Sequence, residues 1–487
     1  MGVIIKNSVK ATIINFIGAA LGMISLLIIQ TSFLTPEQVG ILRLITDKAI
    51  LLLPFILLGI HSSSSRYYFH FENDKKLYGS FMTFILGTPL IMFALGCILF
   101  YYINLSFQVN HIILISIILF ANIYIYIFES YLSTKAKILF PSFLRSIYTR
   151  IVNISLVLIY HFNILNFHQL IIGFTTVYCL YFILLAIYFK RHLTFKIQLN
   201  FAIIKHPIFK EMLVYCAYMG LGVGSGILVN KLDTTMLEGL TKSATPTGIY
   251  TIALSMAAII ELPRRPLAKL SSPILAKNLK TNNMINVLNI YQKSALNLFI
   301  VSGILFALIW VNIDYIFQLI PNGDLYKSGK YVVLLIGIAR IMDLGLGVNS
   351  QIISNSKYFK WLLFITPILA ICTITFNLIF IPKFNIIGAA IASLLAIFIN
   401  CVIRAFLVYK KLDIHPFGKN YFKTIPLFIL PLLICYFIQI ENKWIGLLVN
   451  SSIVAITFCL PVYLMKLSLD LNNLIDNGFK KIRSFLP

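Results

Sequence analysis

Uncharged apolar segments that are long enough to cross a lipid bilayer constrain this chain more than any other feature. Residues 11–34 contain no Asp, Glu, Lys or Arg, and neither do residues 78–103. Each segment exceeds the roughly 20 residues with which an α-helix crosses a hydrocarbon layer about 30 Å thick. Hydrophobic residues make up 59% of the chain and charged residues only 11%, which is too little charge to cover a soluble protein of this size. The sequence therefore predicts an all-α polytopic membrane protein.

About fourteen apolar segments are predicted to be transmembrane helices. They cover residues 11–34, 39–60, 78–103, 112–132, 146–160, 170–189, 212–237, 247–262, 295–320, 331–353, 361–381, 386–409, 422–440 and 444–465. The first segment is too long for a cleavable signal peptide, and no small-residue cleavage site precedes the next segment, so we expect it to stay in the protein.

The loops between these segments alternate between basic and nearly uncharged. One set of loops carries roughly 28 Lys and Arg residues, whereas the other set holds only five, which are Lys242, Lys327, Lys330, Lys383 and Lys443. The positive-inside rule then predicts a multi-pass protein of the bacterial inner membrane with both termini in the cytoplasm. The net charge of +24 is explained by this topology and by the anionic lipids of the inner leaflet, so no nucleic-acid partner is expected.

The longest inside loop divides the chain after six predicted helices. A weak internal repeat supports this division, because Thr35-Pro36 opens the second segment and Thr245-Pro246 opens the eighth. An even number of helices per repeat predicts two six-helix lobes of the same orientation around a central cavity. We expect an N-terminal lobe at 1–190, a cytoplasmic linker at 191–211, a C-terminal lobe at 212–411, and two additional helices with a basic, amphipathic tail at 412–487.

The motifs of several enzyme classes are missing. The sequence has no G-x-x-x-x-G-K-[ST] phosphate-binding loop, which argues against direct coupling to ATP. Its seven cysteines lie in apolar segments without a C-x-x-C pair, and its eight histidines lack metal-binding spacing. We therefore expect no cofactor and no metal site. The outside loops are short, which disfavours a membrane polysaccharide polymerase or ligase.

Charged residues inside the apolar segments are the candidate functional groups. A charge at the centre of a membrane helix costs about 2.5–3.5 kcal/mol on insertion scales, so it indicates function by default. Spacings of four and three residues place Arg43 with Asp47, and Arg340 with Asp343, on common helix faces near the membrane midplane. Each predicted lobe contributes one such pair. The predicted substrate-cavity residues are Arg43, Asp47, Lys48, Lys231, Asp233, Arg340 and Asp343.

Structural interpretations of the same residues stay open. The Arg43–Asp47 and Arg340–Asp343 pairs could simply neutralise each other, which would let their helices insert. Lys231 and Asp233 lie near the outer end of their helix, where they could extend to the membrane interface. For the charges near the inner ends of helices, namely Glu129, Arg150 and Arg404, a structural role is favoured.

Three motifs resemble those of the polysaccharide and O-antigen flippases. Residues 33–40, FLTPEQVG, resemble the turn after the first helix of that family. Residues 231–237, KLDTTML, followed by GIY at 248–250, resemble a second motif, and residues 382–392, PKFNIIGAAIA, resemble the start of the twelfth helix. The chain departs from the family at Thr234, where arginine is usual, and at Asn385, where glycine is frequent. The same superfamily contains the multidrug and toxin extruders and the lipid II flippases.

The resemblance implies a twelve-helix core with two added helices and transport by alternating access. The implied substrate is an undecaprenyl-pyrophosphate-linked oligosaccharide that moves from the inner to the outer leaflet, beside partners such as a polysaccharide polymerase and a chain-length regulator. Physical reasoning agrees, because Arg and Lys in a low-dielectric site suit a pyrophosphate. Exchange for H⁺ or Na⁺ through Asp47, Asp233 or Asp343 stays open. The alternatives are a lipid II flippase, a cation-coupled drug or metabolite exporter of the same fold, and a membrane polymerase or ligase.

Overall fold

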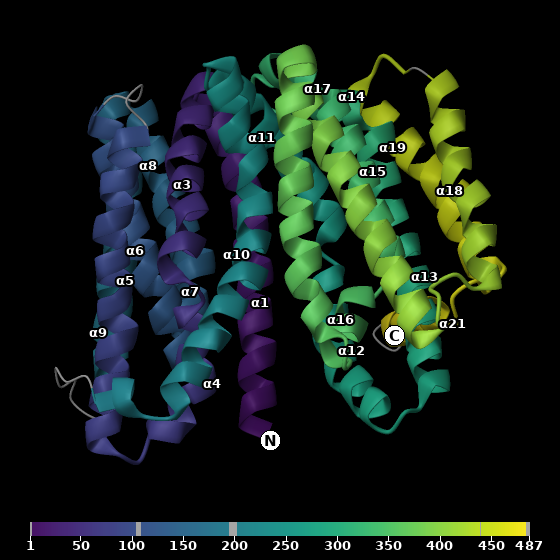
Figure 1. Ribbon diagram of the computed structural model, residues 1–487. Helices are drawn as coiled ribbons and strands as arrows, with labels where there is room; N and C mark the ends of the chain where they lie inside the picture. The colour runs from purple at the N-terminus through teal and green to yellow at the C-terminus, as the bar shows by residue number, and fades with distance from the viewer. Residues whose placement is uncertain (1, 104–108, 194–201, 439, 484–487) are drawn as a thin grey trace. The chain divides into compact units, whose positions relative to one another are not determined.

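The computed structural model describes residues 2–103, 109–193, 202–438 and 440–483, and every regular element within these ranges is helical (Figure 1). The all-α fold predicted from the sequence is thereby confirmed. Part of the predicted linker, residues 194–201 with Lys196, and the end of the predicted basic tail, residues 484–487, lie outside the described residues.

Contacts divide the chain into two compact units, residues 1–248 and 249–487. The first unit contains α1 (Gly2–Ile24), α2 (Thr31–Phe33), α3 (Pro36–Leu57), α4 (Ile60–Phe71), α5 (Lys75–Ile103), α6 (Val109–Thr134), α7 (Leu139–Phe143), α8 (Thr149–His161), α9 (Phe167–Arg191) and α10 (Ile208–Thr241). π-Helical turns at Ser25–Gln30 and Leu144–Tyr148 and a 3-10 turn at Ala202–Lys205 complete it. The division falls after α10 because α10 packs along α3; the predicted six-helix lobes with a linker at 191–211 stay a prediction.

The second unit begins within α11 (Thr245–Ala258), because the boundary at residue 248 leaves the first turn of this helix in the first unit. It contains α12 (Arg264–Lys280), α13 (Met284–Val311), α14 (Ile313–Leu319), α15 (Lys330–Gly345), α16 (Asn349–Asn355), α17 (Leu362–Leu412), α18 (Lys419–Phe437), α19 (Lys443–Val454), α20 (Leu460–Leu464) and α21 (Leu469–Arg483). Short 3-10 turns lie at Ile259–Glu261, Gly323–Gly329 and Phe359–Trp361, and a π-helical turn at Ala455–Cys459.

Among the described residues, nine helices are long and apolar enough to cross a membrane, or up to twelve if each of three bent pairs forms one span. Two features account for the difference from the fourteen predicted spans. Helix α3 is not among the twelve, because it carries Glu37, Arg43, Asp47 and Lys48. Helix α17 counts once although its 51 residues correspond to about 76 Å at 1.5 Å per residue, more than twice the hydrocarbon thickness.

Helix α17 is in fact two helices that meet at Asn385. This residue has φ 52° and ψ −127°, which interrupts the helical backbone. A Cβ atom added to Gly388 would lie 2.1 Å from the carbonyl oxygen of Phe380. In a straight helix these two residues would be about 12 Å apart along the axis, so the chain reverses direction sharply here. The break agrees with the predicted spans 361–381 and 386–409.

The two segments of the internal repeat pack against each other in the first unit. A Cβ atom on Gly40 would lie 2.0 Å from the carbonyl oxygen of Ala244, and one on Gly248 would lie 1.8 Å from the carbonyl oxygen of Pro36. Both contacts require glycine, because any side chain would collide with a backbone atom. The start of α3, where Thr35 and Gln38 form a capping box, is therefore held against the start of α11.

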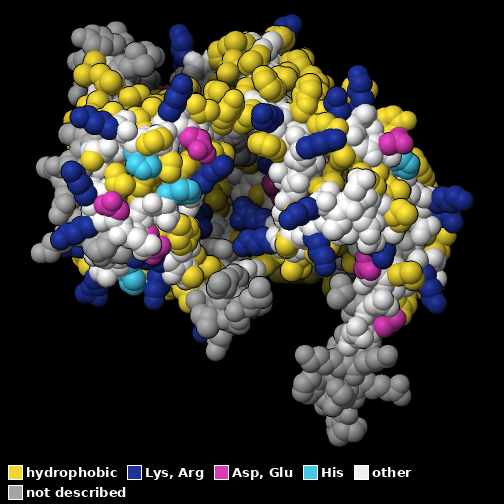
Figure 2. Space-filling model, turned by 60° about the horizontal axis from the view of Figure 1, so that its bottom comes forward, with side chains coloured by type: hydrophobic (Ala, Val, Ile, Leu, Met, Phe, Trp, Pro, Cys, Tyr) yellow, Lys and Arg dark blue, Asp and Glu magenta, His cyan; other side chains and the backbone are white. Residues whose placement is uncertain are grey.

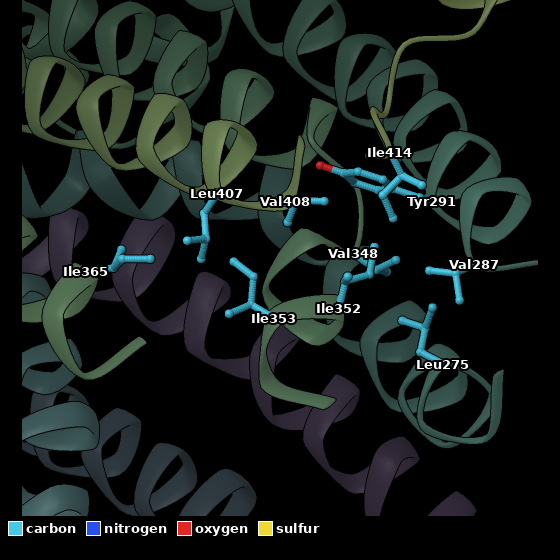
Figure 3. Close-up of a cluster of buried hydrophobic side chains, with 10 residues drawn as sticks. All are labelled: Leu275, Val287, Tyr291, Val348, Ile352, Ile353, Ile365, Leu407, Val408 and Ile414. Atoms are coloured by element: carbon cyan, nitrogen blue, oxygen red, sulfur yellow. The ribbon is translucent and has the colours of Figure 1, made fainter. Parts of the chain in front are cut away.

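A buried apolar cluster joins four helices of the second unit (Figure 3). Its side chains come from α12, α13, α16 and α17, from Val348 directly before α16 and from Ile414 shortly after α17, and they are Leu275, Val287, Tyr291, Val348, Ile352, Ile353, Ile365, Leu407, Val408 and Ile414. Figure 2 turns forward the helix ends that lie at the bottom of Figure 1, and Lys and Arg side chains outnumber Asp and Glu on that face.

Candidate intramembrane ion-pair clusters

In the first unit, Asp47 is the centre of an ion-pair cluster between α3 and α10. Its side chain is only 1% exposed. Its carboxylate accepts hydrogen bonds from Arg43 Nε at 2.7 Å, from Lys231 Nζ at 2.6 Å and from Thr234 Oγ1 at 2.8 Å. Hydrogen bonds from these three donors offset the desolvation free energy that the burial of a carboxylate costs.

Helical spacing explains how these side chains come together. Arg43 and Asp47 lie one turn apart on α3, and Lys231 and Thr234 lie three residues apart on α10, so each pair shares a face. Because α10 packs along α3, the two faces meet. The structure therefore brings Arg43, Asp47 and Lys231 of the predicted site into direct contact.

The other two predicted residues of the first unit lie close by. Lys48 Nζ forms an ion pair with Glu238 Oε2 at 3.0 Å, and this pair also joins α3 to α10. Asp233 is buried on α10, so its side chain does not extend into solvent. Lys231 is likewise held by Asp47, and the interpretation of both residues as groups that extend to the membrane interface is not favoured by these positions.

In the second unit, Asp343 on α15 is the centre of a second cluster. It is buried, its Oδ1 accepts from Arg404 on α17, and its Oδ2 accepts from Arg264 on α12. Arg404 also donates to Ser350 Oγ on α16 at 2.7 Å. Asp343 thereby connects three helices that are far apart in the sequence.

Arg340 and Asp343 do not form the neutralising pair that their spacing in the sequence suggested. Arg340 instead forms an ion pair with Glu261 Oε2 at 3.1 Å, and Glu261 also lies 3.7 Å from Arg264. Both oxygens of Asp343 already accept from Arg264 and Arg404, so Arg340 turns to the second carboxylate. The result is a chain of alternating charges that runs from Arg404 through Asp343, Arg264 and Glu261 to Arg340.

Both clusters carry more cations than carboxylates. The first sets Arg43 and Lys231 against Asp47, and the second sets three arginines against two carboxylates. The least buried cations are Arg43, with 30% of its side chain exposed, Arg264, with 25%, and Arg340, with 20%. In the part of the chain that the structure describes, Arg340 Nε has no hydrogen-bond partner. Such an excess of partly accessible guanidinium groups can bind a phosphate or carboxylate.

Five residues of these clusters were not among the predicted site residues. They are Thr234, Glu238, Glu261, Arg264 and Arg404. The signal for Arg404 was its charge within an apolar segment, but its position near an inner helix end favoured a structural role. Glu129 pairs with Arg145 at 2.9 Å and accepts from Tyr181 at 2.6 Å. Within the described ranges, no group of three or more His, Cys, Asp or Glu could hold a metal ion.

Solved membrane transporters have the same fold. The chain is similar to the lipid II flippase MurJ in an inward closed conformation, with a TM-score of 0.69 and 14% identity over 96% of this chain and 100% of that one. It is also similar to an inward-facing multidrug resistance MATE family transporter of the MOP superfamily, with a TM-score of 0.61 and 13% identity over 84% and 98% of the chains. An outward-facing transporter of that family gives a TM-score of 0.54 and 14% identity over 84% and 96%.

The fold and the apolar helices define a multi-pass membrane protein with the architecture shared by flippases and multidrug transporters. Residues 4–279 match the family described as "Polysaccharide biosynthesis protein". Because this match covers more than half of the chain, the chain belongs to that family, and the family recognised from the sequence motifs is confirmed. A comparison with the sequences of curated proteins found no match.

Proposed function

We propose that this protein is a flippase that moves an undecaprenyl-pyrophosphate-linked oligosaccharide from the inner to the outer leaflet of the bacterial inner membrane by alternating access. The cargo is a repeat unit of an O-antigen, a capsule or an exopolysaccharide, and it is not changed chemically. The observation that carries this proposal is the excess of cations in a buried cluster of each unit, at Arg43 with Lys231 and at Arg340 with Arg264.

A lipid-linked sugar sets a specific physical problem. Its apolar tail remains in the hydrocarbon, whereas its sugars and pyrophosphate cannot cross hydrocarbon without polar partners. A guanidinium offers paired N–H donors that match the oxygens of a phosphate, and these bonds are strong where water is scarce. Arg43, Arg264 and Arg340 are the cations whose exposure leaves room for such a partner.

The energy for transport need not come from ATP. With the cell interior negative, outward movement of about two negative charges gains roughly 4–5 kcal/mol per 100 mV. Exchange for H⁺ or Na⁺ through Asp47, Asp233 or Asp343 is a further part of the proposal. The proposed partners are a polysaccharide polymerase, which would consume the translocated repeat unit, and a chain-length regulator.

A lipid II flippase is the second candidate. The similarity to MurJ extends over 96% of this chain, whereas the similarity to the multidrug transporters extends over 84%. Lipid II also carries a pyrophosphate, so the same cations would serve. A cation-exporting drug transporter is less favoured, because an excess of Arg and Lys repels cationic drugs.

Deletion of the gene separates the two candidates. We expect lipid-linked repeat units to accumulate in the inner leaflet and surface polysaccharide to disappear, while peptidoglycan synthesis continues. Complementation with the unchanged gene restores surface polysaccharide, and complementation with Arg43→Ala does not. Lysis with accumulation of lipid II, at normal levels of surface polysaccharide, would assign the protein to the second candidate.

A further inference from the structure

We propose that a pocket in the C-terminal unit binds the phosphate headgroup of an anionic lipid of the inner leaflet. The pocket, of about 340 Å³, lies where the beginnings of α13, α18 and α21 meet. Its polar lining includes Asn289, Gln292, Lys293, Asn297, Lys419 and Asn420. The pocket shares no residue with the ion-pair clusters, and the proposal does not depend on the proposed transport substrate.

The charge of the pocket suits an anion. Lys293 on α13 and Lys419 on α18 are both exposed, and neither forms an ion pair with a carboxylate among the residues that the structure describes. Asp470 also lines the pocket, but its Oδ2 accepts a hydrogen bond from Asn297 Nδ2 at 3.1 Å. Two lysines against one carboxylate leave the lining with a net positive charge, and the amides of Asn289 and Gln292 add further donors.

Packing holds these polar groups toward the pocket. Tyr291, immediately before Gln292, is buried in the apolar cluster of α12, α13, α16 and α17 (Figure 3). This anchors the side of α13 opposite to Lys293. On the far wall, Asn420 Nδ2 donates to the carbonyl oxygen of Leu467 at 3.0 Å, which fixes the segment before α21 to the start of α18.

The surroundings favour a lipid over a free phosphate ion. Leu469, which lines the pocket, is 63% exposed, and Phe422, one turn into α18, is 60% exposed. Helix α18 continues from there as an apolar span, Lys419–Phe437, and Ile475 on α21 is a further exposed apolar residue, with 41% of it accessible. Polar and apolar surfaces thus adjoin at the depth where a headgroup meets its acyl chains.

The experiment uses the full-length protein in detergent, with the number of retained lipids counted by native mass spectrometry. Phosphatidylglycerol is the anionic probe, and phosphatidylcholine is the zwitterionic reference. The double variant Lys293→Gln with Lys419→Gln removes both cations. At about 1 kcal/mol per lysine near an anionic lipid, we expect the apparent affinity for phosphatidylglycerol to fall roughly 25-fold.

Two matched variants make the result specific. Lys277→Gln with Lys280→Gln changes the net charge equally at exposed positions of α12 outside the pocket, and it should retain phosphatidylglycerol. Lys293→Arg with Lys419→Arg keeps the charge and should also retain it. Equal losses in the pocket variant and the α12 variant would overturn the proposal, as would equal retention of phosphatidylcholine. Inorganic phosphate is tested at the same concentration as the lipid. Retention of phosphate by the original protein, together with its loss in the pocket variant, would show a site for the free ion and overturn the lipid assignment.

Discussion

Thr234 donates a hydrogen bond to Asp47 Oδ2 across 2.8 Å, at the position where the related flippases usually carry an arginine. The hydroxyl supplies a neutral donor to a carboxylate that already pairs with Arg43 and Lys231. An arginine at this position would add a third positive charge to the cluster. The departure from the family pattern therefore leaves the buried carboxylate satisfied with one fewer charge.

Replacement of this hydroxyl should weaken the first unit. Thr234→Val preserves the shape of the side chain but leaves the buried Asp47 one donor short, which should cost about 1–3 kcal/mol. We expect a lower unfolding temperature in detergent and less protein in the membrane. Thr234→Ser keeps the hydroxyl and should remain within about 1 kcal/mol of the original. An unchanged unfolding temperature in Thr234→Val would show that the bond contributes nothing to stability.

Arg404 and Arg340 should have different roles in the second cluster. Arg404→Ala removes one of the two ion-pair partners of the buried Asp343, and the loss of a buried ion-pair partner typically costs about 3–5 kcal/mol. We expect its membrane abundance to fall. The double variant Arg404→Ala with Asp343→Ala should recover part of that abundance, because no lone carboxylate remains. Quantitative immunoblots of membrane fractions measure both effects.

Arg340→Ala should instead abolish export while the protein level stays near normal, since Arg340 pairs with the partly exposed Glu261. Arg340→Lys should restore export only in part, because an ammonium lacks the paired donors of a guanidinium. Surface polysaccharide is measured alongside abundance for each variant. Full export by Arg340→Ala would exclude a role for this residue in substrate binding.

The break in α17 offers a test of backbone strain. Asn385 adopts φ 52° and ψ −127°, a conformation that glycine reaches far more easily than residues with a side chain. Asn385→Gly should therefore raise the unfolding temperature, by the equivalent of about 1 kcal/mol, whereas Asn385→Val should lower it by about 1–3 kcal/mol. Asn377→Gly, inside a regular helix of the same segment, provides the comparison and should destabilise. A lower unfolding temperature in Asn385→Gly would contradict the strain argument.

Reporter fusions test the predicted topology. Because the basic loops contain roughly 28 Lys and Arg residues against five in the others, fusions at Lys76 and Lys205 should report the cytoplasm, and a fusion at Asn322 should report the outside. Alkaline phosphatase and green fluorescent protein give opposite signals at each site. An outside signal at Lys205 would contradict the predicted division after six helices.

The sequence alone was sufficient to predict that this protein lies in a lipid bilayer and to predict most of its helices. Apolar segments separated by basic loops predict membrane helices directly, because a helix in hydrocarbon needs no partner to satisfy its backbone. The end of one apolar segment and the start of the next predicted the helix break before residue 386. Charges within apolar segments indicated that Arg43, Asp47 and Arg340 need partners. These are properties of single segments, and the order of residues along the chain is sufficient to read them.

Only the tertiary structure decided which charges pair. Local spacing matched Arg340 with Asp343, yet Asp343 accepts from Arg264 and Arg404, which lie 79 and 61 positions away along the chain. The close contact of Gly40 with Ala244 joins residues that lie even farther apart along the chain, by 204 positions. Such choices depend on how α12, α15 and α17, or α3 and α10, pack side by side, and a buried carboxylate takes whichever donors that packing brings within reach.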